Sequence, residues 1–208
     1  MKLKIVVARY HEKLEWTKEY GDHILVYNKG EDDVDEYNPI KMENVGREGH
    51  TFYKHIYDNY DNLDDYTIFL QGKPHDHAPN VYNVLRRLIK KAEADENDFG
   101  FAFISTKIFR TFRKGCPYNR KIPMPDVYDK LFIKEYGKFH ESFKFCAGAQ
   151  IIVSKEKIRE RPKEFYLQIV EMLGKHKNPK EGHCIERYHR LVFDFENAKL
   201  LRNPRIIA

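Results

Sequence analysis

The chain has 208 residues, of which 41% are hydrophobic and 33% are charged, and its formal net charge is +5. This length suits a single large domain, and the 14 Phe and 14 Tyr residues can fill a substantial core. The 37 basic residues are mixed with 32 acidic ones, which excludes a polybasic arm. A mildly basic surface of this kind fits anionic ligands such as nucleotides, and it does not require nucleic acid as a partner.

The cysteines and the first residues of the chain bear on the cellular compartment of the protein. Cys116, Cys146 and Cys184 are widely spaced and form no zinc-binding pattern, so we expect free thiols in a reducing environment. The first apolar run is too short for a signal peptide, and no stretch approaches the ~18 apolar residues of a membrane span. These features predict a cytoplasmic protein without a membrane span. The last residues show no evident stop signal, which favours residues 1–208 as one domain at the start of a longer protein.

The first strand is predicted at Leu3–Ala8, where a run of aliphatic residues indicates a buried, parallel, central strand. Open α/β sheets bind ligands at the carboxyl ends of their strands. Ala8, Arg9 and Tyr10 are therefore candidates for holding a nucleotide base. The alternatives are a surface ion pair for Arg9 and a packing role for Tyr10.

A second strand is predicted at His23–Asn28, and a helix follows at Thr51–Tyr60, where aromatic and aliphatic residues recur on one face. Arg47 precedes this helix. Backbone N–H groups at a helix start favour anions, so Arg47 is a candidate for contacting a phosphate. A salt bridge at the helix start is the alternative.

The stretch Asp65–Asn80 carries the strongest site signal. Tyr66–Leu70 predicts a buried strand, Gln71 and Lys73 follow it in a turn, and Pro79 begins a helix. Between them stands the sequence His75-Asp76-His77. An aspartate just beyond a buried strand suits a divalent ion that takes one or two carboxylates from the protein and its other ligands from diphosphate and water. The alternative is a surface turn in which Pro and Asp have their usual roles.

The remaining segments complete an α/β pattern. Strands are predicted at Phe99–Ser105 and Phe145–Val153, and helices at residues 81–92, 125–136, 165–173 and from Gly182 onward. Lys107–Pro125 is basic, aromatic and without a clean period, so we interpret it as a functional lid or a solvated loop. Strands that alternate with helices predict a single α/β domain with a mostly parallel central sheet flanked by helices.

Several common enzyme signatures are missing from the sequence. There is no GxGxxG after the first strand and no GxxxxGK[ST], which argues against classical dinucleotide and P-loop sites. There is also no GxSxG and no HExxH, which mark two large groups of hydrolases.

Six sequence blocks, taken together, resemble a family of small domains found in fungi and large DNA viruses. In order they are VVARYHEKLEW, VYNKG, NVGREGHTFYKHIYDNYDNL, YTIFLQGKPHDH, GAQIIVSKEKIRERPKEFY and GHCIERYHRLVF. The resemblance covers residues 3–194. The blocks also resemble the N-terminal glycosyltransferase domain of a chlorella-virus multidomain protein that builds capsid glycans. Six ordered blocks are much more specific than any single motif.

The resemblance implies a GT-A fold, a UDP-sugar donor carrying rhamnose or another hexose, a divalent ion, and a glycan or capsid glycoprotein as acceptor. For a viral protein, the expected location is the host cytoplasm. GT-A enzymes hold the diphosphate through a metal on an Asp-x-Asp motif, whereas this chain has His75-Asp76-His77 in its place. The implied metal ligands are thus Asp76 and His77, and a histidine ligand favours Mn²⁺ over Mg²⁺.

GT-A enzymes also bind uridine at the end of the first strand. We therefore predict that UDP lies across Ala8–Tyr10, Arg47 and Gln71, and that binding strengthens with Mn²⁺. Lys73 and Arg47 can supply cations to the departing diphosphate.

The resemblance leaves two stereochemical routes open. If configuration is inverted, a carboxylate acts as general base, and Glu186 and Glu141 are the candidates. If configuration is retained, which we favour, the resemblance suggests front-face attack with Gln150 near the sugar.

Two alternatives belong to other functional classes. Arginines interleaved with aromatic residues in Phe109–Arg120 would suit a module that binds RNA or single-stranded DNA, but the basic residues are dispersed along the chain. A metal-dependent phosphohydrolase would use His75, Asp76, His77 and His183 to release phosphate from nucleotides without an acceptor sugar.

Overall fold

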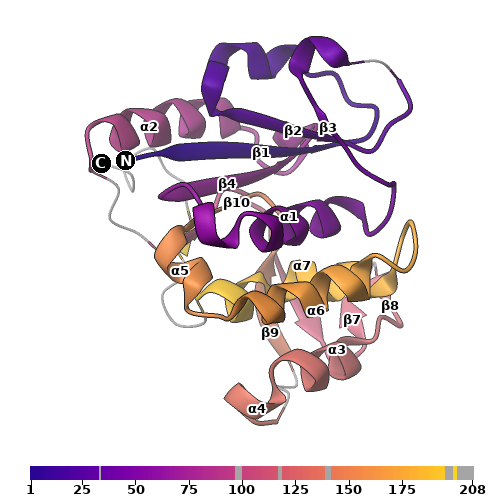
Figure 1. Ribbon diagram of the computed structural model, residues 1–208. Coiled ribbons are helices and arrows are strands. Elements are labelled where there is room, and N and C mark those ends of the chain that lie inside the picture. Colours follow the sequence, from indigo (N-terminus) through magenta and orange to yellow (C-terminus); the bar gives the residue numbers. More distant parts are fainter. Residues whose placement is uncertain (33, 97–99, 117–118, 139–141, 195–198, 201–208) are drawn as a thin grey trace.

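The computed structural model of the protein describes residues 1–32, 34–96, 100–116, 119–138, 142–194 and 199–200. Within these ranges, a central sheet organises the molecule, with its strands in the order β11-β5-β10-β4-β1-β2-β3 (Figure 1). Its strands are β1 (Leu3–Arg9), β2 (Ile24–Asn28), β3 (Ile40–Lys41), β4 (Tyr66–Gln71), β5 (Phe101–Phe103), β10 (Ile151–Ser154) and β11 (Lys199–Leu200).

The strand β1 lies in the middle of this sheet, as its run of aliphatic residues predicts. It pairs in parallel with β2 on one side and β4 on the other, and Ile5, Val6 and Val7 are fully buried. The pairs β2–β3 and β5–β11 are also parallel. Only the pairs that β10 makes with β4 and β5 are antiparallel among the described strands of this sheet. The predicted α/β class with a mostly parallel sheet is confirmed.

Helices cover both faces of the sheet (Figure 1). Successive side chains of a strand point to opposite faces, so Val6 belongs to one hydrophobic core while Ile5 and Val7 belong to another. Helices α1 (Arg47–Asp58), α6 (Lys163–Leu173) and α7 (Lys180–Phe193) close the first core. Helix α2 (Val81–Glu93) and the 3₁₀ helix η1 (Glu15–His23) close the second. The shorter helices are α3 (Met124–Leu131), α4 (Ile133–Tyr136), α5 (Lys155–Arg159), η2 (Asp35–Tyr37), η3 (Tyr60–Asn62) and η4 (Pro74–Asp76).

The prediction of one strand over Phe145–Val153 is wrong. The run is divided between β9 (Ser142–Cys146), which belongs to a second sheet, and β10 in the central sheet. Between them the backbone turns at Gly148 and Ala149, which have positive φ angles of 98° and 49°. Gly148 also lies so close to His77 that a Cβ atom there would be 2.3 Å from the His77 Cβ. An apolar run does not reveal such a turn, because both of its halves are buried.

The interpretation of Lys107–Pro125 as a loop without regular structure is also wrong. In the described part of this segment, β6 (Ile108–Phe112), β7 (Gly115–Cys116) and β8 (Asn119–Arg120) form an antiparallel sheet with β9, in the order β8-β7-β6-β9. The partner of β6 is more than thirty residues away, with Ile108 opposite Cys146. Local periodicity does not report a pairing over that distance.

Other predicted elements differ only at their ends. Helix α1 begins at Arg47 instead of Thr51, α7 begins two residues before Gly182, and the helix predicted at residues 125–136 is divided into α3 and α4. The strand predicted at Phe99–Ser105 is limited to β5, and residue 99 lies outside the described residues.

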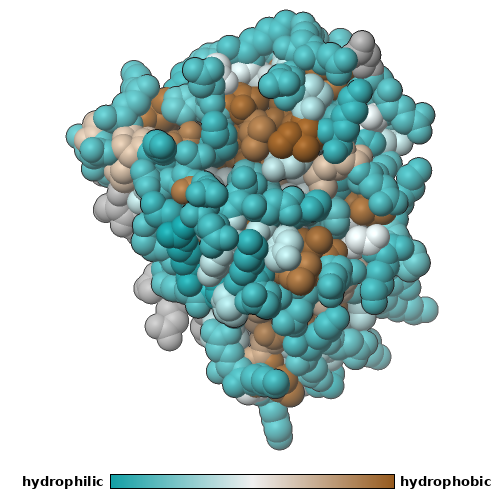
Figure 2. Space-filling view, in the orientation of Figure 1, coloured by the Kyte–Doolittle hydropathy of each residue, from teal (hydrophilic) through white to brown (hydrophobic). Residues whose placement is uncertain are grey.

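The visible face in Figure 2 is mostly hydrophilic, and its hydrophobic side chains form separate patches. In the described ranges, no helix has the length and apolar character required to cross a membrane. Cys146 and Cys184 are buried free thiols, as predicted.

Candidate functional site

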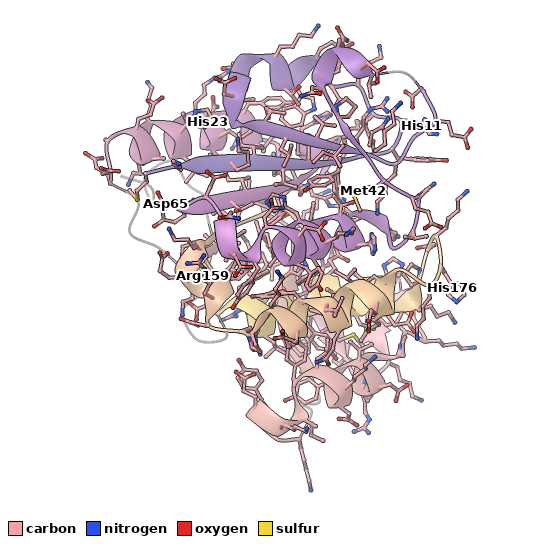
Figure 3. The ribbon with its side chains drawn as sticks, in the orientation of Figure 1. His11, His23, Met42, Asp65, Arg159 and His176 are labelled. Carbon is pink, nitrogen blue, oxygen red and sulfur yellow. The ribbon has the colours of Figure 1, made fainter. Side chains whose placement is uncertain are left out.

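The carboxyl ends of β1, β2 and β4 meet at one edge of the central sheet. The register places Ala8 beside Gln71 and Arg9 beside Asn28. A cleft of about 370 Å³, which we call the first cleft, opens at this edge. In Figure 3, His11 and His176 project on this side of the molecule, whereas Asp65 and Arg159 lie at the opposite end of the sheet. All residues that the glycosyltransferase prediction assigned to the nucleotide or the metal line this cleft: Ala8, Arg9, Tyr10, Arg47, Gln71, Lys73, Asp76 and His77. Of the two further histidines of the phosphohydrolase alternative, His75 does not line it and His183 instead lines the cleft described next.

A second cleft of about 380 Å³ adjoins the first. The two share the lining residues Arg47, Glu48, Gln71 and His77. The second cleft is also lined by Phe109 of β6, by the turn between β9 and β10, and by His183, Glu186 and Arg187 of α7. The small sheet and α7 therefore extend the site beyond the edge of the central sheet.

The first cleft carries an excess of basic side chains. Among the described residues that line it, Arg9, Lys29, Arg47, Lys73 and Lys177 are basic, whereas Glu12, Glu48 and Asp76 are acidic. An excess of one sign of charge in a cleft attracts ligands of the opposite sign. The first cleft thus favours an anion.

Arg9 is a buried residue in the wall of the first cleft, and its guanidinium is bonded within the protein. It is only 4% exposed, forms an ion pair with Asp32, and donates to the Asn28 Oδ1 and the Glu12 carbonyl oxygen, both at 2.9 Å. Its guanidinium holds the pKa of Asp32 below the usual range of an aspartate. Tyr10, in contrast, is 43% exposed and available for stacking on a planar ligand.

Arg47 stands between the two clefts. Both Gly46 and Arg47 have positive φ angles, of 65° and 53°, and a residue other than glycine in this conformation costs on the order of 1–3 kcal/mol. The loop before α7 stabilises this turn, because the Gly46 N–H donates to the His176 carbonyl oxygen at 2.8 Å. The Arg47 guanidinium lies 3.4 Å from the Asn178 Oδ1 and 3.4 Å from the His183 Nε2.

The metal candidates provide few ligands of their own. Asp76 is half exposed, and its carboxylate lies 3.3 Å from the Lys73 Nζ. The Nδ1 of His77 is buried without a hydrogen-bond partner among the described residues, and burial lowers the pKa of this imidazole, with Lys107 as the next cause. No three His, Cys, Asp or Glu side chains of the described ranges are grouped to hold a metal ion. One exposed carboxylate and a neutral imidazole fit an ion that completes its coordination with phosphate oxygens and water.

The second cleft contains a partly buried carboxylate. Glu186 accepts a hydrogen bond of 2.7 Å from the backbone N–H of Gly148, and its Oε2 lies 3.6 Å from the Arg187 guanidinium. Burial raises the pKa of Glu186 above the usual range. A carboxylate with a raised pKa in a cleft is suited to proton transfer.

The other two catalytic candidates lie elsewhere. Gln150 is fully buried and does not line either cleft. Its Nε2 donates to the Gln71 Oε1 at 3.2 Å and to the Pro74 carbonyl oxygen at 3.3 Å, while its Oε1 accepts from the Ser105 hydroxyl. Gln150 thus positions Gln71 and the turn that carries Asp76. Glu141 lies outside the described residues.

Sequence reasoning missed several residues of the two clefts. Lys29 follows the predicted second strand just as Arg9 follows the first, so its position could have identified it. Glu48 and Lys177 gave no comparable signal, because their positions depend on how α1 and the loop before α7 pack against the sheet edge. The site role of Phe109 depends on the small sheet, which periodicity does not predict.

The comparisons with known proteins place the chain in a family. The family described as "Protein of unknown function (DUF3431)" matches residues 5–203. A comparison with curated protein sequences finds no match. Since the match covers nearly the whole chain, the protein belongs to the DUF3431 family.

Proposed function

We propose that the protein is a metal-dependent glycosyltransferase that moves a sugar, rhamnose or another hexose, from a UDP-sugar to a glycan acceptor on a viral capsid glycoprotein. The observation that carries this proposal is the pair of adjoining clefts. The first is basic and suits the nucleoside diphosphate of a donor, while the second contains a partly buried carboxylate and suits the acceptor hydroxyl. The resemblance of six sequence blocks to a GT-A domain supplies the sugar and the capsid acceptor.

The donor would lie along the first cleft. Tyr10 would stack on the uracil ring, and Arg47 and Lys73 would bind the diphosphate through charge-assisted hydrogen bonds. Asp76, with His77, would hold the divalent ion, which when bound neutralises the charge that develops on the leaving diphosphate.

The acceptor would enter the second cleft, whose position next to Arg47 and Gln71 brings it beside the donor sugar. Glu186 would take the proton of the acceptor hydroxyl as the oxygen forms its bond to the anomeric carbon. The bond from that carbon to the diphosphate oxygen breaks, and the diphosphate leaves with the electron pair. Because Gln150 is buried behind Gln71, we propose inversion by this route in place of retention beside Gln150.

The test is calorimetric titration of the protein with UDP, GDP and TDP, each with Mn²⁺, with Mg²⁺ and with a chelator. We expect UDP to bind most tightly and Mn²⁺ to strengthen its binding. Equal affinities for UDP with Mn²⁺ and with chelator would contradict the metal bridge. Release of phosphate from nucleotides at a rate that does not depend on any acceptor would point to the phosphohydrolase instead.

A further inference from the structure

Lys29 is a buried lysine in the wall of the first cleft. It directly follows β2 and is only 7% exposed, yet it lines the cleft. Its Nζ donates to the Val45 carbonyl oxygen at 2.5 Å and to the Arg47 carbonyl oxygen at 2.6 Å. An ammonium group has three N–H donors, and in the described part of the chain these two carbonyl oxygens are its hydrogen-bond acceptors. One donor is left for a group in the cleft.

No carboxylate of the described residues lies within the 4 Å of an ion pair with Lys29. Of the charged groups around it, Glu48 of α1 is already close to Arg47, with 3.5 Å between the Glu48 Oε2 and the Arg47 Nε. On β1, Arg9 is neutralised by Asp32. A buried charge without a counterion is unfavourable.

The other titratable neighbours do not compensate the charge. His50 of α1 has its pKa lowered to about 4, mainly by burial and next by Lys29, so it is neutral near pH 7. Lys177, from the loop before α7, adds positive charge to the same cleft. Burial lowers the pKa of Lys29 itself to about 8, with only Glu48 acting in the other direction. The surroundings of Lys29 are therefore short of negative charge.

We propose that Lys29 forms an oxyanion subsite in the first cleft, in which its ammonium group binds a phosphate oxygen of the ligand while holding the Val45–Arg47 turn. An anion from the cleft supplies the missing counterion and the third acceptor. The same ammonium fixes the left-handed turn that directs Arg47 between the clefts, so one group links anion binding to the placement of Arg47. This inference rests on the proposed function for the identity of the anion as a nucleoside diphosphate.

The subsite makes affinity depend on pH in a defined direction. Below about pH 8 the free protein already carries the Lys29 proton, so this lysine adds no pH dependence there. Above about pH 8 the free protein loses the proton, whereas the anion complex retains it. Binding then requires proton uptake, and affinity falls by up to about tenfold per pH unit.

The experiment compares wild type, Lys29→Met and Lys73→Met by calorimetric titration with UDP and with inorganic pyrophosphate, from pH 6.5 to pH 9.5. Lys73 is the matched comparison, because it is an exposed lysine in the same cleft. At each pH the Kd of a variant is divided by that of wild type, which cancels the titration of the ligand itself. Circular dichroism melting of each variant checks that it is folded.

We expect Lys29→Met to weaken the binding of both ligands by roughly tenfold to a hundredfold at pH 6.5. The ratio of its Kd to that of wild type should approach one as the pH rises above 8. The ratio for Lys73→Met should stay constant. A folded Lys29→Met protein with wild-type affinity at pH 6.5, or a ratio that does not change with pH, would overturn the subsite. If wild type binds neither ligand, the subsite is also overturned. If pyrophosphate binding depends on Lys29 but UDP binds no more tightly than pyrophosphate, the subsite stands and the nucleotide-sugar proposal fails.

Discussion

Glu186 and Gly148 are joined by a hydrogen bond of 2.7 Å between the glutamate Oε1 and the backbone N–H of the glycine. This bond joins α7 to the turn between β9 and β10, and both residues line the second cleft. The turn has a left-handed conformation at Gly148 and packs against His77. The turn that is bonded to the candidate base therefore also contacts His77, one of the two metal candidates.

Glu186→Gln should lower kcat by about a hundredfold or more, because the amide cannot take a proton but can still accept the Gly148 N–H. The KM for the donor should change little. The matched comparison is Glu48→Gln. Glu48 is another carboxylate that lines the clefts, and it is paired with Arg47, so we expect a smaller loss of kcat. Similar losses in both variants would remove the special role of Glu186.

The pH profile gives an independent check of this role. A general base must be ionised, and burial raises the pKa of Glu186. Transfer by wild type should therefore be lost, as the pH falls, at a higher pH than an ordinary glutamate would give. This acid limb should be absent from the residual activity of Glu186→Gln, measured as kcat between pH 4.5 and pH 8. A limb that persists unchanged in the variant belongs to another group.

Asp76→Asn should abolish transfer while leaving the fold intact. The carboxylate is half exposed and the basic groups beside it, Lys73 and His75, are exposed side chains, so its removal should barely change the melting temperature. Loss of one anionic metal ligand would lower the transfer rate by roughly a thousandfold. Asp58→Asn is the control, since Asp58 is an exposed aspartate paired with Lys54 away from the clefts. An Asp76→Asn protein that transfers sugar at nearly the wild-type rate would make the segment a structural turn.

Phe109→Ala should raise the KM for the acceptor by roughly tenfold and leave the affinity for UDP unchanged. Phe109 is 37% exposed and lines the second cleft, where an aromatic face can cover the apolar side of a sugar ring and contribute about 1–2 kcal/mol. Phe112 is also exposed on β6 but does not line the cleft. Steady-state kinetics with Phe112→Ala should therefore match wild type. Equal effects of the two substitutions would indicate a general effect on the small sheet.

Stability should decrease as the pH falls below about 6.5, because buried histidines resist protonation. Burial lowers the pKa of His189 to about 3 and is the main cause that lowers those of His50 and His55 to about 4. Each contributes stability above the pKa of about 6.5 in the unfolded chain, and that contribution is lost as the pH falls toward the folded value. Between pH 7 and pH 5 the loss is about 2 kcal/mol per histidine.

His189→Gln isolates one of these contributions. The variant should lose about 2 kcal/mol less than wild type between pH 7 and pH 5, measured as the free energy of unfolding in urea. His23→Gln provides a comparison at a less buried site, because His23 is partly exposed and hydrogen-bonded to the Leu3 carbonyl oxygen. The same pH dependence in wild type and His189→Gln would mean that His189 does not resist protonation in the folded state.

The sequence by itself determined the sheet edge and the residues that follow its strands. Ile5, Val6 and Val7 belong to an aliphatic run that predicts a buried central strand, and Arg9 directly follows the predicted strand. These signals are local, because a strand and the residues that follow it are contiguous in the chain. That is why the residues assigned to the nucleotide and the metal all line the first cleft.

Only the tertiary structure decided what each of these side chains can reach. Gln150 looked like a site residue, but packing buries it behind Gln71. Lys29 follows a predicted strand, but only packing shows that the Val45–Arg47 turn covers it in the cleft wall. The small sheet that places Phe109 depends on pairing between β6 and β9, which are far apart in the chain. Burial and long-range pairing depend on contacts between distant segments, and composition and periodicity report only on neighbours.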